Sequence, residues 1–131
     1  MDEVTNLEEE KRYGLEFEYQ MIQGEVDVAE IIINGRNELP VFLTMSDDQL
    51  LCICYLWSED EVNHSTRTEM MEAMLDINIP MPLSSFAKIG DKYVVFGALS
   101  LKSSPEDVAL ELTTLSDNAL DAITTMSEYL V

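Results

Sequence analysis

The residues of this chain best suited to metal or thiol chemistry are Cys52, Cys54 and His64. A zinc site requires about four nitrogen or sulfur ligands in spaced pairs. On a strand, two cysteines separated by one residue share a face, where they are poorly placed to form a disulfide with each other. Buried cysteine commonly serves as a small apolar residue. We therefore expect both thiols in the core and no metal site.

Other catalytic and ligand-binding patterns are missing from the sequence. His64 is the only histidine, and no Gly-X-Ser-X-Gly turn accompanies it. With 26 acidic residues, pairs of carboxylates are inevitable and say little. The glycines form no phosphate-binding loop, and the acidic loops lack the spacing of a calcium-binding loop. The sequence predicts no catalytic, cofactor or metal site, and hence a protein that is not an enzyme.

The charge balance narrows the class of partner. The chain has 26 Asp and Glu against 7 Lys and Arg, which gives a net charge of −19. Such a surface disfavours nucleic acid and anionic membranes and favours a basic or cationic-amphipathic protein segment. The alternative is that the acidity only keeps the protein soluble.

The apolar runs of the chain are short, and its cysteines are few. The longest apolar run, residues 50–57, is far shorter than the ~20 residues that span a bilayer. With no disulfide framework and no signal peptide, the chain is expected to be cytoplasmic, without direct membrane insertion.

Alternating and β-branched segments predict strands at residues 15–21, 26–33 and 41–45. Residues 49–57 are apolar on both faces, which predicts an inner strand covered on both sides. A hairpin turns at Gly90-Asp91, and its second strand contains Tyr93-Val94-Val95-Phe96, again apolar on both faces. Gly97 is expected to mark a bulge or a close helix crossing.

Two helices are expected between and after these strands. Thr66 to Glu69 has the form of a capping box, and Asn78 ends the helix before a Pro-X-Pro segment. Ser104 and Pro105 begin the last helix. Its apolar residues follow a heptad seam, with a kink or restart at Ser116-Asp117-Asn118 left open; the seam residues are Val108, Leu112, Leu115, Ala119, Ala122 and Met126.

Together these elements predict one α+β domain over residues 1–131. It has a mainly antiparallel sheet of about five strands with helices packed on it, in the order helix, three strands, helix, two strands, helix. Residues 1–14 are expected to be a short helix or a frayed end.

Methionines and the heptad seam supply the candidate protein-binding residues. Methionine is over-used at adaptable binding surfaces, although a helical stripe more often fills a core. The seam either contacts a second chain or packs on its own sheet. The candidates are Met70, Met74, Met81, Leu112, Leu115 and Ala119.

Three blocks resemble the uncharacterised bacterial YjfI family, a domain of unknown function: residues 38–43 with 46–53, residues 72–84 with 86–89, and residues 91–100. Residues 115–119 belong with them. The resemblance covers roughly residues 24–131, and its most specific part is Asn78-Ile79-Pro80-Met81-Pro82-Leu83-Ser84. The family implies no reaction. It does imply a setting, because members are often encoded beside phage-shock-protein-A-like membrane stress proteins. The element order is similar to that of type III secretion chaperones and YbjN-like proteins, although fold alone does not fix function.

We therefore expect a non-catalytic protein-binding domain, chaperone- or adaptor-like, linked to bacterial envelope stress and forming a homodimer. Its partner is expected to be basic, or a phage-shock-protein-A-like protein. The alternative is a small-molecule-binding regulator or small enzyme with an unrecognised pocket.

Overall fold

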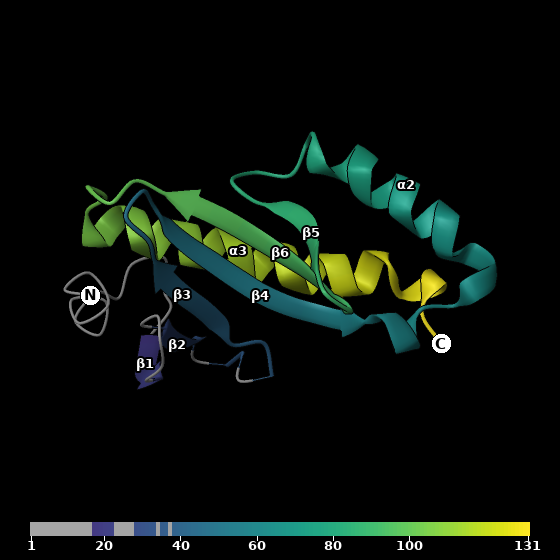
Figure 1. Cartoon of the computed structure of the whole chain (residues 1–131), viewed down its shortest axis with the longest axis horizontal. Coiled ribbons are helices and arrows are strands. Elements are labelled where there is room, and N and C mark those ends of the chain that lie inside the picture. The colour runs from purple at the N-terminus through teal and green to yellow at the C-terminus, as the bar shows by residue number, and fades with distance from the viewer. Residues whose placement is uncertain (1–16, 23–27, 34, 37) are drawn as a thin grey trace.

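A computed structural model describes residues 17–22, 28–33, 35–36 and 38–131 (Figure 1). The predicted helix or frayed end at residues 1–14 lies outside these residues. The strands and helices are β1 (Phe17–Ile22), β2 (Val28–Ile33), β3 (Val41–Met45), β4 (Leu50–Ser58), α2 (Arg67–Asn78), β5 (Ser85–Ile89), β6 (Lys92–Leu99) and α3 (Pro105–Thr125). Short 3₁₀ turns, η2 (Glu59–Glu61), η3 (His64–Thr66) and η4 (Ser127–Tyr129), join or follow them.

The strands form one six-stranded sheet in the order β1-β2-β3-β4-β6-β5, and every neighbouring pair is antiparallel. The predicted α+β class, a mainly antiparallel sheet with helices packed on it, is confirmed. The sheet has one strand more than the five expected, because four strands rather than three precede α2. Each of the first three connections is short enough to join antiparallel neighbours.

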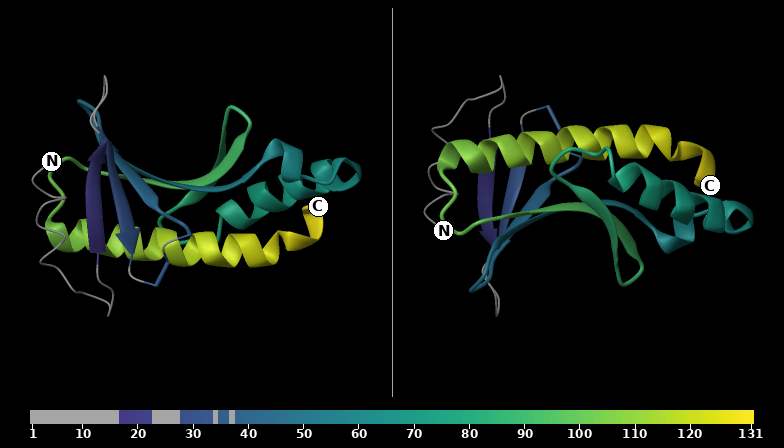
Figure 2. Two further views of the ribbon diagram at one scale, coloured as in Figure 1. Left: turned by 90° about the horizontal axis from the view of Figure 1, so that it is seen from below. Right: turned by 90° about the horizontal axis from the view of Figure 1, so that it is seen from above.

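One face of the sheet holds the core. Its central row crosses five strands and is buried throughout: Ile31, Val41, Cys54, Val95 and Phe86. Helix α3 contacts β4 and β6, and α2 contacts β5. Figure 2 shows both helices on the same side of the sheet. We call this side the closed face.

The opposite side, which we call the open face, has a different environment. Its central row is Glu30, Phe42, Ile53, Phe96 and Ser85, and all five residues are only half-buried. Among the described residues, no helix lies on this side (Figure 2). The expectation that β4 is covered on both sides is therefore wrong for the described part of the chain, because α2 and α3 both pack on the closed face.

The last helix begins as expected. The Ser104 hydroxyl accepts a hydrogen bond from the Asp107 amide at 3.1 Å, and the Asp107 carboxylate accepts one from the Ser104 amide. Pro105 occupies the first turn. The helix then runs unbroken to Thr125, without a restart at residues 116–118. Its heptad seam is buried against the chain's own sheet, which is one of the two alternatives left open above.

The start of α2 differs from the prediction. The Thr66 side chain caps no helical amide, so the expected capping box is wrong. A 3₁₀ turn precedes the helix, and Asn63 caps that turn by accepting from the Ser65 amide at 3.1 Å. At its other end, α2 stops at Asn78 as predicted. The Asn78 side-chain oxygen accepts a hydrogen bond from the Phe86 amide at 2.6 Å and so ties the helix end to β5.

Candidate functional site

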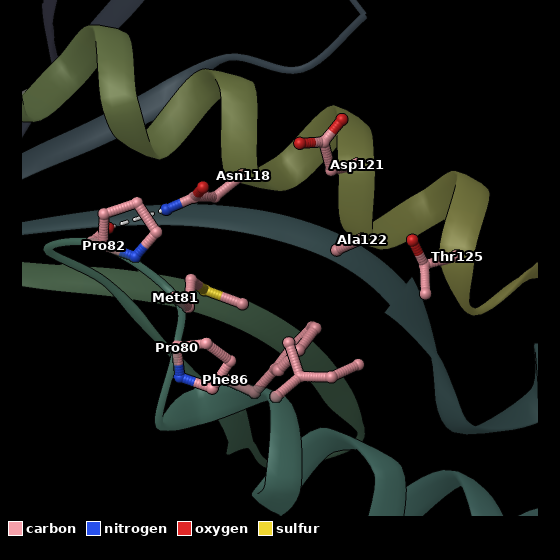
Figure 3. A pocket seen from close by; sticks show the side chains of 9 residues that line it. Pro80, Met81, Pro82, Phe86, Asn118, Asp121, Ala122 and Thr125 are labelled. Carbon is pink, nitrogen blue, oxygen red and sulfur yellow. Dashed lines mark hydrogen bonds between the residues drawn. The ribbon is translucent and has the colours of Figure 1, made fainter.

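An open groove runs between the segment 79–84 and the C-terminal half of α3 (Figure 3). Its volume is about 210 Å³, and its lining is mostly apolar: Ile77, Pro80, Met81, Pro82, Phe86, Asn118, Asp121, Ala122 and Thr125. We call it the Met81 groove. Pockets that hold drug-sized ligands typically measure about 300–1,000 Å³. The groove therefore has the size for one or two apolar side chains rather than for a large cofactor.

The Pro-X-Pro segment is held in place from α3. The Asn118 amide donates hydrogen bonds to the Pro82 carbonyl at 2.9 Å and to the Ser84 hydroxyl at 2.7 Å. The Met81 amide donates to the Ile77 carbonyl at 3.1 Å. Two prolines further restrict the backbone around Met81. These hydrogen bonds connect the groove wall to α3 and to the end of α2.

Exposed apolar side chains surround this groove. Ile79 is 88% exposed, and Leu83 is 56% exposed. Leu75, on α2, is 69% exposed and lines a second groove between α2 and β5, together with Met74 and Phe86. Phe86 lines both grooves. Clustered apolar exposure of this kind is typical of protein-binding surfaces.

Acidic residues flank the apolar surface. Asp121 lines the Met81 groove, and Asp117 lies one turn before it on α3. On α2, Glu72 and Asp76 are exposed. Asp117 is paired with Arg36 at 2.8 Å, and Arg36 also donates to the Ser116 hydroxyl at 2.8 Å. The surface therefore combines apolar anchoring positions with negative charge.

The structure separates the six candidate residues into two groups. Met81 is half-buried and lines the Met81 groove, and Met74, although 5% exposed, lines the second groove. The other four candidates have no exposed surface and belong to the core: Met70, Leu112, Leu115 and Ala119. These four side chains are inaccessible to a partner in the folded chain. The sequence pattern located them on apolar stripes, but both stripes face inward.

The thiols are in the core, as expected. Burial, and secondarily the nearby Glu111, raises the pKa of Cys52 to about 12, and burial raises that of Cys54 to about 11. Both therefore remain protonated thiols, which are poor nucleophiles. His64 is exposed in η3. Within the described ranges, no group of three His, Cys, Asp or Glu side chains is arranged to hold a metal ion.

A buried carboxyl group lies between α3 and the sheet, and sequence reasoning missed it. Glu111 is 4% exposed, and its Oε1 is buried without a hydrogen-bond partner. Burial raises its pKa. The side chain fits because Gly97 has no Cβ. A Cβ built there would lie only 1.9 Å from Glu111 Oε1 and 3.0 Å from the Leu83 carbonyl oxygen. The expectation of a close helix crossing at Gly97 is confirmed.

A charged cluster anchors α2 to the sheet. Arg67 Nη2 lies 2.7 Å from Glu59 Oε1, and Arg67 Nε also donates to this carboxylate. The Tyr93 hydroxyl donates to the same carboxylate at 3.0 Å. Hydrogen bonds, chiefly from Arg67, lower the pKa of Glu59. Because its groups are mutually satisfied and the Tyr93 ring stacks on Trp57, we interpret this cluster as structural.

No helix in the described part of the chain has both the length and the apolar character needed to cross a bilayer.

Comparison with known proteins identifies the chain's relatives. A family described as "Uncharacterized protein conserved in bacteria (DUF2170)" matches residues 2–130. "Uncharacterized protein YjfI" of Escherichia coli (strain K12) is 35% identical over 103 residues, which cover 76% of each chain. The protein of the same name from Escherichia coli O157:H7 matches equally well. The chain therefore belongs to the bacterial DUF2170 family, to which the predicted YjfI-like resemblance pointed.

Proposed function

We propose that this domain is a non-catalytic protein-binding module, chaperone- or adaptor-like, and that the Met81 groove receives an apolar side chain of a basic, amphipathic segment. The supporting observation is an apolar groove whose wall is hydrogen-bonded to α3, with exposed Ile79 and Leu83 in the same segment and exposed Leu75 on the second groove, on a protein with a net charge of −19. Buried apolar anchors supply most of the affinity of such contacts, while complementary charge speeds association.

Two features favour a helical segment as the partner. The Met81 groove and the second groove lie on either side of Phe86, which lines both. An amphipathic helix presents apolar residues at successive turns, which suits two adjacent grooves. Its basic face then meets Asp121 and the exposed acids of α2, Glu72 and Asp76. Methionine lines both grooves, and its flexible side chain adapts to different partners.

The natural partner we propose is a basic segment of a phage-shock-protein-A-like membrane stress protein, which would link the domain to bacterial envelope stress. This step rests on the setting implied by the family resemblance. Reciprocal co-purification of the two proteins at low and high salt tests it. A salt-labile complex that is lost with Met81→Asp is expected, and a complex indifferent to that substitution would argue against this site.

The direct test uses a synthetic helical peptide of leucine and lysine in an amphipathic arrangement. Isothermal titration calorimetry is expected to show binding that weakens with salt, because Lys–carboxylate attraction is screened. Met81→Asp is expected to weaken binding about tenfold or more, since a charge would enter the apolar groove. The matched control is Met45→Asp, at a methionine 41% exposed on β3. Equal binding by both variants would exclude the Met81 groove.

The alternative, a small-molecule-binding regulator or small enzyme, requires a deep pocket with converging polar groups. A hollow of about 410 Å³ lies beside Gly35, Arg36, Glu38, Leu39 and Leu120. Its cation, Arg36, is already paired with Asp117 and Ser116. The structural observations therefore favour protein binding. Ligand-induced thermal stabilisation by a small organic anion, lost in Arg36→Ala, would support the alternative.

A further inference from the structure

The open face of the sheet carries an apolar surface that the proposed function does not use. Three rows of residues cross the strands on this face: Glu30, Phe42, Ile53, Phe96 and Ser85; Tyr55, Val94 and Ala87; and Val28, Thr44, Leu51 and Ala98. Of these, Val94 is already fully buried within the chain. A shallow hollow of about 300 Å³ lies over β4, β6 and β5, and no charged residue lines it. Tyr55 is 41% exposed, and Ile89 is 44% exposed.

The open face has the composition of a covered surface. An antiparallel sheet with one solvated side normally alternates apolar and polar residues. Here β4 carries Leu51, Ile53 and Tyr55 on the open side, and β6 carries Val94 and Phe96. Phe42 and Tyr55 already form an edge-to-face aromatic pair, with ring centroids 5.7 Å apart. Aromatic residues with few charges are typical of the centre of an interface.

The charge distribution indicates what covers this face. A basic segment finds no carboxylate within this hollow, and in the hollow that Tyr55 lines, the one carboxylate, Glu61, shares the lining with Lys92. Two copies of an acidic protein, by contrast, repel least when they meet through an uncharged surface. The charged residues that the strand register places on this face are Glu18 on β1, Glu30 on β2 and Lys92 on β6, so both signs of charge occur there, on different strands. A twofold axis lying in the interface can bring Glu30 of one copy opposite Lys92 of the second copy, and by symmetry the same pair then forms twice.

We propose that the open face is a self-association surface, on which a second copy of this chain packs sheet against sheet around Tyr55, Ile53 and Phe96. The resulting dimer leaves the Met81 groove free, because that groove lies between α3 and the 79–84 segment, on the helix side of the sheet. This proposal also replaces the heptad seam as the site of dimerisation, because Leu112, Leu115 and Ala119 are fully buried.

The test is sedimentation equilibrium of the full chain over a range of concentrations. We expect a monomer of 14.8 kDa in equilibrium with a dimer, with a dissociation constant of roughly 1–100 µM. Added salt should strengthen the dimer, because it screens repulsion between like-charged copies. Binding of the basic peptide should weaken over the same salt range. The opposite responses distinguish the two surfaces.

Tyr55→Arg tests the location of the interface. It is expected to raise the dissociation constant of the dimer at least about tenfold, because it replaces a tyrosine at the centre of the interface by a positive charge on both copies. Leu110→Arg, at a residue 39% exposed on α3, is the matched control and should leave the dimer intact. Circular dichroism verifies that both variants are folded. If Tyr55→Arg does not fold, Ala98→Arg, at an exposed position of the same face, replaces it.

A charge exchange adds an independent measurement. Glu30→Lys alone is expected to weaken the dimer, and Glu30→Lys combined with Lys92→Glu to restore it. A wild-type chain that stays monomeric at about 1 mM overturns the proposal. So does a dimer unaffected by the open-face variants. If Tyr55→Arg abolished peptide binding but left the mass of the chain in solution unchanged, the open face would bind the partner and not a second copy. Met81→Asp is expected to lose peptide binding and to keep the dimer.

Discussion

The two faces of the sheet differ in burial, as two neighbouring rows of residues show. Each residue of one row is next in sequence to a residue of the other, so their side chains lie on opposite faces. The closed-face row contains Ile31, Val41, Cys54, Val95 and Phe86, all buried. The open-face row contains Glu30, Phe42, Ile53, Phe96 and Ser85, all half-buried. Both rows have an apolar centre. The difference therefore lies in what covers them, since α2 and α3 lie on one side only of the described sheet (Figure 2).

The comparison separates residues that stabilise the fold from residues available for contacts. Side chains under α3 are enclosed by their own chain, so their apolar area contributes to folding. Half-buried side chains on the open face keep part of their area exposed, and that part does not contribute to folding. The Met81 groove is a third case, because the segment 79–84, hydrogen-bonded to α3 through Asn118, leaves a hollow beside that helix.

The largest expected effect comes from the same truncation made on each face. Leu43→Ala, at a fully buried closed-face position, should lower the free energy of unfolding by about 2–5 kcal/mol. Leu51→Ala, half-buried on the open face, should cost about 1 kcal/mol or less when the chain is dilute enough to be monomeric. Urea unfolding provides both values. Equal losses would show that the open face is as enclosed as the closed one.

Gly97→Ala tests the closest contact of the closed face. The new Cβ would meet the Glu111 carboxylate at 1.9 Å, so we expect a loss of about 1–3 kcal/mol. Shortening the opposing side chain in the double variant Gly97→Ala with Glu111→Ala should recover part of this loss. The recovery is partial because the Leu83 carbonyl oxygen is also only 3.0 Å away. Strictly additive losses in the double-mutant cycle would mean that the two residues do not meet.

Glu111→Gln tests the buried carboxyl itself. Because burial raises the pKa of Glu111 in the folded state above its ordinary value of 4.5, the folded chain binds this proton more tightly than the unfolded chain does. The associated stability is fully present below the unfolded pKa and is lost as the pH rises through the folded pKa. Between about pH 5 and about pH 8, the melting temperature of Glu111→Gln should therefore fall less than that of the wild type. If the melting temperatures of the two proteins changed in parallel with pH, the Glu111 carboxylate would be exposed to water in the folded chain.

Ionic strength has the smallest effect and acts on the whole molecule. Nineteen net negative charges repel one another in the folded state, and salt screens that repulsion. Under conditions where the chain is monomeric, the melting temperature should rise modestly from low to moderate salt. A melting temperature indifferent to salt would mean that the charges lie too far apart to interact.

Local sequence signals were reliable where a short motif determines the structure. Ser104 and Pro105 marked the start of α3, Asn78 marked the end of α2, and Gly90-Asp91 marked the β5–β6 turn. The Thr66 capping box failed because Thr66 ends a 3₁₀ turn, where its hydroxyl donates to the Asn63 carbonyl instead of capping α2. The apolar patterns located four strand segments before α2, whereas the expected element order counted only three strands there.

The candidate site was only partly visible in the sequence, for a physical reason. Heptad and methionine patterns show that a stripe is apolar, but they do not show which surface it meets. Leu112 and Met70 thus belong to the core, whereas Met81 lines a groove. Glu111 was hidden because a single acid among 26 has no sequence signature of burial. The double apolar pattern of β4 predicted cover on both sides, whereas the described part of the chain covers one side only.

The most direct test of the proposed function uses the eight methionines as reporters. With ¹³C-labelled methionine methyl groups, NMR spectra are recorded while the leucine–lysine peptide is added. We expect the methyl signal of Met81 to shift most and that of Met74 next. The signals of exposed Met45 and of the core residues Met70 and Met126 should not shift. Shifts at Met45 with an unchanged Met81 signal, or no shifts at any methionine, would contradict the assignment of the Met81 groove as the binding site.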